Sequence, residues 1–166
     1  RIICGNGSDD ILSIITQAFS REGGEVICSE YGFIYYPIVA KVSGAKVVTA
    51  KSKDYSISCK NILASISKKT KIIFLANPNN PTGTIIMKNE LVSFLKKVPQ
   101  NILVVVDGAY AEYVTDLKFS DGLNLTNQFP NLIITRTFSK IFALAGLRLG
   151  WAYSSEKIIE TLEKIR

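Results

Sequence analysis

The stretch Ile102-Leu-Val-Val-Val-Asp107 decides the fold. Its first five residues are all apolar, whereas a strand with one face in water alternates apolar and polar side chains. A continuous apolar strand is typical of a parallel sheet that helices cover on both faces. An unpaired carboxylate at its end would be costly to bury. We therefore expect Asp107 to meet a cation or several hydrogen-bond donors; the alternative is that it caps the following short helix.

Helical and strand patterns alternate on both sides of this stretch. Ser8 and Asp9 precede apolar residues at helical spacing, so we expect them to cap a helix that Gly23-Gly24 ends. The order of the elements predicts one α/β domain over residues 1–166, a three-layer αβα fold with a mostly parallel sheet. The further expected elements are strand 25–28, helix 33–42, strand 46–50, helix 60–67, strand 71–76, helix 88–97, strand 102–107, strand 132–135, a short strand about Trp151 and a helix opened by residues 154–156.

Length and composition limit the class of protein. The chain has 166 residues, of which 47% are hydrophobic, enough for the core of one domain. It begins at Arg1 instead of methionine, and a candidate strand follows at once, so we expect an interior piece of a longer protein. The sequence has neither an apolar run of membrane-spanning length nor a signal-peptide pattern. Both observations argue against a membrane protein.

The cysteines and the charge favour neither a metal site nor a nucleic-acid partner. Cys4, Cys28 and Cys59 are far apart, and the sequence has no histidine to complete a metal site. We interpret them as reduced thiols of a cytoplasmic protein. The net charge of +6 comes mostly from lysines that stand singly or in pairs. A solvated surface is therefore favoured over a nucleic-acid-binding stripe.

Four loops are candidates for the chemistry of the protein. In parallel sheets, ligands bind at the carboxyl ends of the strands, in the loops that lead to the next helices. Glycine, asparagine, proline, hydroxyl and charged residues gather there in four loops: Gly5-Asn-Gly-Ser-Asp9, Asn77-Pro-Asn-Asn-Pro-Thr-Gly83, Asp107-Gly-Ala-Tyr110 and Thr137-Phe-Ser-Lys140.

The first two loops are suited to binding but have plainer alternatives. Residues 5–9 lead directly into a helix, whose free backbone N–H groups could bind a phosphate, although an ordinary helix cap is as good an interpretation. Residues 77–83 contain two prolines, which fix the loop and the direction of its asparagine amides. A simple turn would not need both prolines.

Two cations stand in the otherwise apolar and small-residue stretch Thr137-Phe-Ser-Lys-Ile-Phe-Ala-Leu-Ala-Gly-Leu-Arg-Leu-Gly150. We expect apolar neighbours to desolvate Lys140, which would increase the fraction of neutral amine able to attack a carbonyl. The alternative is that the side chain extends to solvent. Arg148 stays protonated and presents a rigid fork suited to a phosphate.

One ligand would satisfy all four loops. It needs a phosphate for the glycine loop and Arg148, a carbonyl for Lys140, a basic ring nitrogen for Asp107 and a ring oxygen for Asn80 and Tyr110. Pyridoxal 5'-phosphate has each of these groups. The set GNGSDDIL, NPNNPTG, DGAYAEY and RTFSKIFALAGLRLG, in this order and spacing, resembles the aspartate-aminotransferase-like (fold-type I) pyridoxal-phosphate enzymes. Within that family, the motifs are most similar to those of the histidinol-phosphate aminotransferases.

The resemblance implies roles for the residues around the cofactor ring. Lys140 would carry the cofactor and then shuttle the proton of the substrate α-carbon, and Asp107 would pair with the pyridinium nitrogen. Asn80 and Tyr110 would bond the ring oxygen, and Phe33 would stack on the ring face. The nearby tyrosines 31, 35 and 36 are alternatives to Phe33.

The resemblance also implies a phosphate site and a reaction. The backbone of Gly7 and Ser8, with Thr137, Ser139 and Arg148, would hold the cofactor phosphate. The implied reaction transfers an amino group from histidinol phosphate to 2-oxoglutarate, giving imidazole acetol phosphate and glutamate, in a cytoplasmic homodimer that acts on amino and keto acids in histidine biosynthesis.

Two features leave alternatives open. Gly108 stands where many relatives have glutamate. We expect residues 1–166 to lack the N-terminal arm and the C-terminal small domain of the family, so that the piece by itself could bind the cofactor without turnover. The alternatives are another class I or II aminotransferase, an amino-acid phosphate decarboxylase, or a non-enzymatic pyridoxal-phosphate-binding regulatory module fused to a DNA-binding domain.

Overall fold

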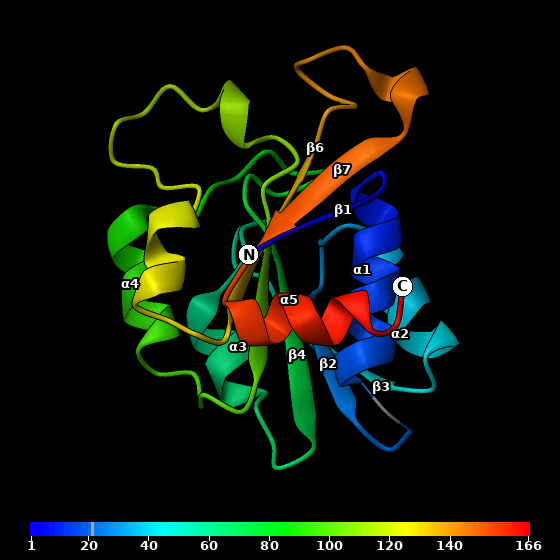
Figure 1. The fold of residues 1–166 in the computed structure, drawn as a ribbon. Coiled ribbons are helices and arrows are strands. Elements are labelled where there is room, and N and C mark those ends of the chain that lie inside the picture. Colours follow the sequence, from blue (N-terminus) through cyan, green and yellow to red (C-terminus); the bar gives the residue numbers. More distant parts are fainter. Residues whose placement is uncertain (21) are drawn as a thin grey trace.

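The structure, a computed structural model, describes residues 1–20 and 22–166. Helices and strands alternate along most of the chain (Figure 1). Their bounds are β1 (Ile2–Asn6), α1 (Ser8–Phe19), β2 (Glu25–Ser29), α2 (Tyr35–Val42), β3 (Lys46–Ala50), α3 (Cys59–Ala64), β4 (Thr70–Ala76), α4 (Lys88–Leu95), β5 (Leu103–Asp107), β6 (Leu132–Thr137), β7 (Leu149–Tyr153) and α5 (Glu156–Glu163), with short 3-10 turns at Ala111–Tyr113, Leu123–Asn127 and Ala145–Leu147.

The strands of the described residues form a seven-stranded sheet in the order β1-β7-β6-β5-β4-β2-β3. The strands from β6 to β3 in this order run parallel to their neighbours, whereas β7 is antiparallel to both β6 and β1. Because β7 is antiparallel to both of them, β1 and β6 run in the same direction. The carboxyl ends of β1, β4, β5 and β6 therefore lie at one edge of the sheet, where the four candidate loops begin.

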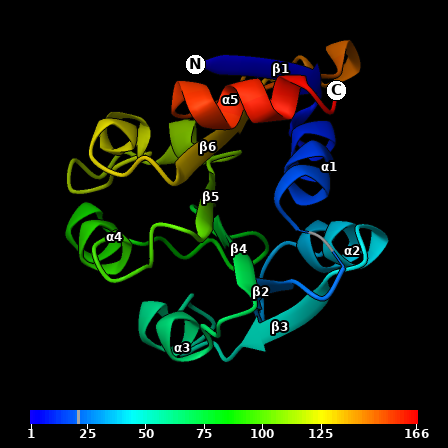
Figure 2. The ribbon, with the colours of Figure 1, turned by 60° about the horizontal axis from the view of Figure 1, so that its bottom comes forward.

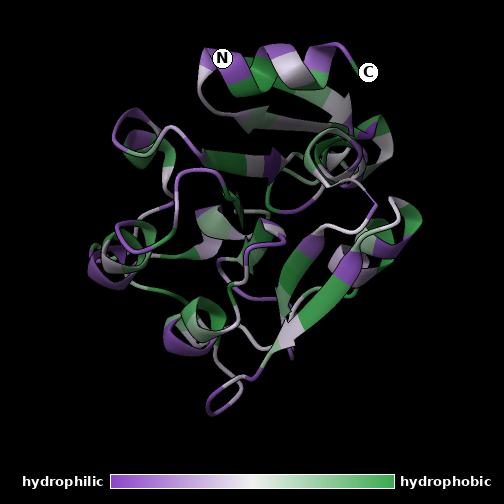
Figure 3. Cartoon of the chain, turned by 90° about the horizontal axis from the view of Figure 1, so that it is seen from below, coloured by the Kyte–Doolittle hydropathy of each residue, from purple (hydrophilic) through white to green (hydrophobic). Residues whose placement is uncertain are grey.

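Helices cover both faces of the sheet, as the apolar stretch 102–106 predicts (Figure 2). Side chains of β5 alternate between two cores: Leu103 and Val105 pack with α1, α2 and α5, whereas Val104 and Val106 pack with α3 and α4. Hydrophobic residues follow the central strands and the sheet-facing sides of the helices (Figure 3). The predicted three-layer α/β fold with a mostly parallel sheet is confirmed.

The structure corrects several local expectations. Helix α2 begins at Tyr35 instead of Phe33, and α3 ends at Ala64 instead of residue 67. Ser8 and Asp9 do not cap α1: Gly7 occupies the cap position, and Ser8 is already the first helical residue. The reason is the left-handed backbone of Gly7, with φ of 81°, which turns the chain into the helix one residue earlier.

Candidate active site

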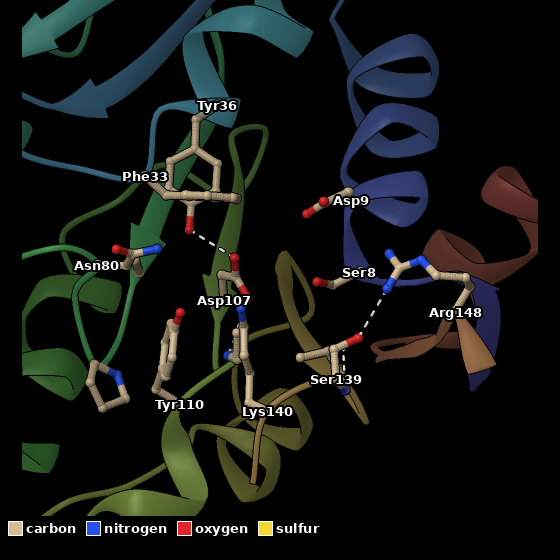
Figure 4. Close-up of a pocket in the computed structure, with 14 residues that line it drawn as sticks. Ser8, Asp9, Phe33, Tyr36, Asn80, Asp107, Tyr110, Ser139, Lys140 and Arg148 are labelled. Atoms are coloured by element: carbon tan, nitrogen blue, oxygen red, sulfur yellow. Dashed lines mark hydrogen bonds between the residues drawn. The ribbon is translucent and has the colours of Figure 1, made fainter. Parts of the chain in front are cut away.

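A cavity of about 170 Å³ lies at the carboxyl edge of the sheet (Figure 4). Every residue of the sequence-predicted site lines it except Gly7, which lies beneath Arg148. The cavity is also lined by Asp9, Ala76, Pro78 and Ala109, which had no predicted binding role, and by Tyr36, which was an alternative to Phe33. The full lining is Ser8, Asp9, Phe33, Tyr36, Ala76, Pro78, Asn80, Asp107, Ala109, Tyr110, Thr137, Ser139, Lys140 and Arg148.

Asp107 lies at the end of β5 and is buried, with 5% of its surface exposed. It follows Val105 on the same side of the strand, so it faces α1 and α2. Its Oδ1 accepts hydrogen bonds from Thr135 Oγ1 at 3.0 Å and from the Ala109 N–H at 3.3 Å. Its Oδ2 accepts one from the Tyr36 hydroxyl at 2.9 Å. The expectation of several donors is thus confirmed.

Burial is the main influence on the Asp107 carboxyl and raises its pKa, while the three donors lower it. No cation within the described residues forms an ion pair with Asp107. A buried carboxylate that has donors but no cation gains from a positively charged ligand. The cavity beside Asp107 is therefore suited to a protonated ring nitrogen.

The contact of Tyr36 with Asp107 was not predicted from the sequence, which offered Tyr36 only as an alternative to Phe33. It is 1% exposed, and its ring stacks on Phe74 with centroids 4.7 Å apart. Burial and the nearby Asp107 raise the pKa of the Tyr36 hydroxyl well above its ordinary value, which keeps it a proton donor. Tyr36, Val39 and Ala40 share the buried side of α2, and a buried tyrosine needs a hydrogen-bond partner. The helical spacing of these three residues was the sequence signal that Tyr36 is buried.

The aromatic residues near the start of α2 have separate surroundings. Tyr31 lies against Tyr55 and is 43% exposed, and the Tyr35 hydroxyl lies 2.9 Å from Ser13 Oγ. Phe33 is half-buried, lines the cavity and meets the Tyr36 ring edge-on, with centroids 5.5 Å apart. Among these rings, Phe33 is the one without a hydroxyl and is suited to cover an apolar ring face.

Two of the three asparagines in the loop 77–83 are committed to hold its shape. Asn77 is fully buried, and its side chain both donates to the Ile86 carbonyl and accepts from the Ile86 N–H. The Asn79 amide donates to the Tyr31 carbonyl and to Thr82. Asn80 lines the cavity, on the same side as Tyr110 in Figure 4. This arrangement leaves Asn80 available for a ligand.

The glycine loop and Arg148 form the opposite end of the cavity (Figure 4). A Cβ at Gly7 would lie 2.5 Å from a terminal nitrogen of Arg148, so the guanidinium rests directly on this glycine. Arg148 also donates to Ser139 Oγ at 3.2 Å. The Ser139 N–H donates to the Thr137 hydroxyl at 3.1 Å. Hydroxyl groups, a helix start and a fixed cation together are suited to a phosphate.

Lys140 differs from its sequence-based expectation. Its side chain is exposed, because the segment that follows β6 leaves the sheet and its apolar side chains do not close over the lysine. The expected desolvation by these neighbours is therefore wrong for this structure. The Lys140 ammonium lies 5.2 Å from the centre of the Tyr110 ring, a cation–π distance. The lysine still lines the same cavity as Asp107.

Neither a metal cluster nor a membrane-spanning helix occurs in residues 1–20 and 22–166. The part of the chain that the structure describes contains no cluster of three acidic, histidine or cysteine side chains that could hold a metal ion. None of its helices is long and apolar enough to cross a membrane. The three cysteines are free thiols, two of them buried.

The chain is similar to known proteins along its whole length. The family described as aminotransferase class I and II matches residues 1–166. Histidinol-phosphate aminotransferase from Pelagibacter ubique is 45% identical over 166 residues, covering 100% of this chain and 46% of that protein. The enzyme from Rhodospirillum centenum is 43% identical with the same coverage. The crystal structure of histidinol-phosphate aminotransferase from Sinorhizobium meliloti in complex with pyridoxal-5'-phosphate matches with a TM-score of 0.93 at 30% identity, covering 99% of this chain and 45% of that one.

The chain spans about half the length of the curated relatives it matches. The family resemblance drawn from the four motifs is confirmed along the whole chain.

Proposed function

The chain belongs to the class I and II aminotransferase family, and from this premise we propose that residues 1–166 form the cofactor-binding large domain of a pyridoxal-phosphate-dependent aminotransferase. The observation that carries the proposal is the placement of Lys140, Asp107 and Arg148 around one cavity. A lysine, a carboxylate and a fixed guanidinium match the aldehyde, ring nitrogen and phosphate of this cofactor.

Two features of the structure fit the cofactor. Asp107 is buried with hydrogen-bond donors and without a cation among the described residues, as expected of a partner for a pyridinium. Gly7 leaves space that a side chain would fill, so the Arg148 guanidinium and the start of α1 approach each other closely. Both ends of the cavity therefore offer what a charged ring and a phosphate need.

Each side chain has a distinct proposed task. When bound, pyridoxal phosphate supplies an aldehyde that combines with amines and a ring that accepts the electron pair left at the substrate α-carbon. Lys140 would hold the cofactor at its aldehyde group, and its free amine would move the proton of the substrate α-carbon. Asp107 keeps the proton on the ring nitrogen. Asn80 and Tyr110 donate to the ring oxygen.

The other lining residues orient the cofactor. Phe33 covers one face of the ring and excludes water from it. The phosphate is held by backbone N–H groups of Gly7 and Ser8, by the hydroxyls of Thr137 and Ser139, and by Arg148.

We propose histidinol phosphate as the amino donor and 2-oxoglutarate as the acceptor, within histidine biosynthesis. Support comes from the two curated relatives above, which carry the name histidinol-phosphate aminotransferase at 43–45% identity. Their additional length leaves room for further substrate-binding residues. The substrate assignment therefore applies to the full-length protein.

We also propose a homodimer in the cytoplasm. The segment 141–149 supports the dimer, since Ile141, Phe142, Leu144, Leu147 and Leu149 expose 37–66% of their surfaces, as an association surface would. The free cysteines support a reducing compartment. Light scattering of the full-length protein should give twice the mass of one chain. A monomer that turns over at full rate would contradict the dimer.

The cofactor proposal is tested by absorbance and borohydride reduction. The full-length protein is mixed with pyridoxal phosphate, its spectrum is recorded before and after reduction, and the adduct is located by peptide mass mapping. We expect one reduced adduct on Lys140, absent in Lys140→Ala and retained in Lys157→Ala, a lysine on α5 away from the cavity. A folded protein that forms no adduct on Lys140 would overturn the proposal.

A further inference from the structure

Three hydrogen bonds fix the orientation of the Asp107 carboxylate. Thr135 lies beside Asp107 in the pairing of β5 with β6, so its donation to Oδ1 follows from strand register. The Ala109 N–H also donates to Oδ1, as part of the chain leaving β5. Oδ2 has one protein donor among the described residues, the Tyr36 hydroxyl. Tyr36 is therefore the contact that α2 makes with this carboxylate.

Packing holds the Tyr36 hydroxyl in place. The ring lies nearly parallel to Phe74, with an interplanar angle of 7°, and Phe33 packs against it edge-on at 87°. A side chain fixed on both sides loses little further freedom when it donates to Asp107. A hydrogen bond to an ionised acceptor also stabilises the charged form more than the neutral one.

We infer that Tyr36 is a positioning residue that keeps the Asp107 carboxylate ionised and directed into the cavity, so that it holds a proton on a cationic ring nitrogen. This inference rests on the proposed function for the identity of the ligand. Its first step, the effect of Tyr36 on Asp107, concerns the protein alone. Tyr36 acts through Asp107 and does not itself take part in proton transfer.

Other ionisable groups surround the pair and set the background against which Tyr36 acts. Asp9, at the start of α1, raises the pKa of both Asp107 and Tyr36 through its charge, and Cys28 on β2 further raises that of Tyr36. The other ionisable side chains that line the cavity are Tyr110, Lys140 and Arg148. All of them remain in the variants chosen below, so a change in the titration midpoint of Asp107 reports on the altered hydroxyl.

The chain offers a matched control on the same helix. Tyr36→Phe removes the hydroxyl that meets Asp107, whereas Tyr35→Phe removes one that meets Ser13 instead. Thr135→Val is a second test, since it removes a donor to Oδ1 at nearly constant volume. Each variant deletes one hydroxyl hydrogen bond, so the comparison separates contact with Asp107 from a general loss of stability.

The experiment titrates the Asp107 carboxyl in the full-length protein without cofactor. Carboxyl carbons of aspartate are isotope-labelled, and the Asp107 signal is identified by its loss in Asp107→Asn. Removing a hydrogen bond to a charged group should raise the Asp107 midpoint by about one to two pH units in Tyr36→Phe, and in the same direction in Thr135→Val. Tyr35→Phe should match the parent. Affinity for pyridoxal phosphate should fall about 10-fold in Tyr36→Phe.

Unchanged Asp107 midpoints in folded Tyr36→Phe and Thr135→Val proteins would overturn the inference, as would an equal rise in Tyr35→Phe. Circular dichroism checks folding in each case. Failure of the proposed function is seen separately, as a parent protein that forms no reduced adduct on Lys140. An adduct on Lys140 together with an unmoved midpoint would leave the cofactor site intact and remove the role of Tyr36.

Discussion

The site has two contrasting parts, the strand ends around Asp107 and the segment 140–149 that follows β6. Both are rich in apolar residues in the sequence, yet Val104, Val105 and Val106 are completely buried while Phe142 and Leu147 are 46% and 66% exposed. The difference is that the first stretch pairs with strands on both sides and lies between two helical layers. An apolar segment is thus buried where strand pairing places it between other elements of the fold.

The sharpest test of this contrast compares two phenylalanines. Phe94 on α4 is 2% exposed, so Phe94→Ala should lower the free energy of unfolding by about 3–5 kcal/mol. Phe142→Ala should change it by less than about 0.5 kcal/mol in the chain 1–166, because little is lost at an exposed site. Urea unfolding measures both.

The same pair in the full-length protein extends the comparison. A cost above about 2 kcal/mol for Phe142→Ala there would show that another surface, from the rest of the chain or from a second copy, covers this side chain. Equal costs for the two variants in the chain 1–166 would contradict the contrast itself.

Asp107→Asn tests the chemistry of the buried part. The substitution keeps the shape but removes the negative charge, so turnover by the full-length protein should fall about 10²–10³-fold, the usual effect of losing one preorganised electrostatic partner. Asp116→Asn, on an exposed loop beyond the cavity, is the control and should keep the parent rate. Steady-state kinetics measures both, and parent-like turnover in Asp107→Asn would contradict the proposed pairing.

Two glycines of the C-terminal region should respond differently to alanine. A Cβ at Gly150 would lie 2.4 Å from the Ser8 backbone nitrogen, whereas at Gly146 it would meet nothing within 4 Å. Gly150→Ala should therefore cost about 1–3 kcal/mol and weaken binding of pyridoxal phosphate, because it displaces the start of α1. Gly146→Ala should be within about 1 kcal/mol of the parent. Thermal unfolding and cofactor titration check this, and equal effects of the two substitutions would refute the close approach.

The smallest expected effect is a pH dependence. The Asp107 pKa is raised in the folded protein, chiefly by burial, so folding favours the protonated acid. Asp107 therefore costs stability as the pH rises from its unfolded value, about 3.8, through the folded value. The stability of Asp107→Asn relative to the parent should rise over this window, by no more than about 1.4 kcal/mol per pH unit, and then level off. Urea unfolding at several pH values measures this difference in stability. A difference that does not change with pH would indicate that the Asp107 pKa is not shifted.

Much of the fold followed from local patterns. The continuous apolar stretch 102–106 predicted a sheet covered on both faces, and the rule for parallel strands placed the four loops at one edge. The loops then met around one cavity. Identification of the cofactor came from the motif set as a whole, because each motif alone had a simpler explanation.

Other features depend on tertiary arrangement and were not visible in the sequence. Tyr36 meets Asp107 across 71 positions, which local periodicity cannot show. Lys140 was expected to be desolvated because its neighbours are apolar, but desolvation requires those neighbours to fold over it. The antiparallel pairing of β7 with β1 and β6 likewise was not predicted from strand composition.

The pairing of β1 with β7 has a consequence for protein synthesis. Asn6 pairs with Leu149, so 143 further residues must be added after Asn6 before its partner has been made. At typical elongation rates this takes roughly 7–30 s, during which β1 waits without the strand that positions Ser8. The phosphate-binding end is therefore among the last parts of this chain to form, and a nascent chain interrupted before residue 149 would carry an unpaired strand open to association with other chains.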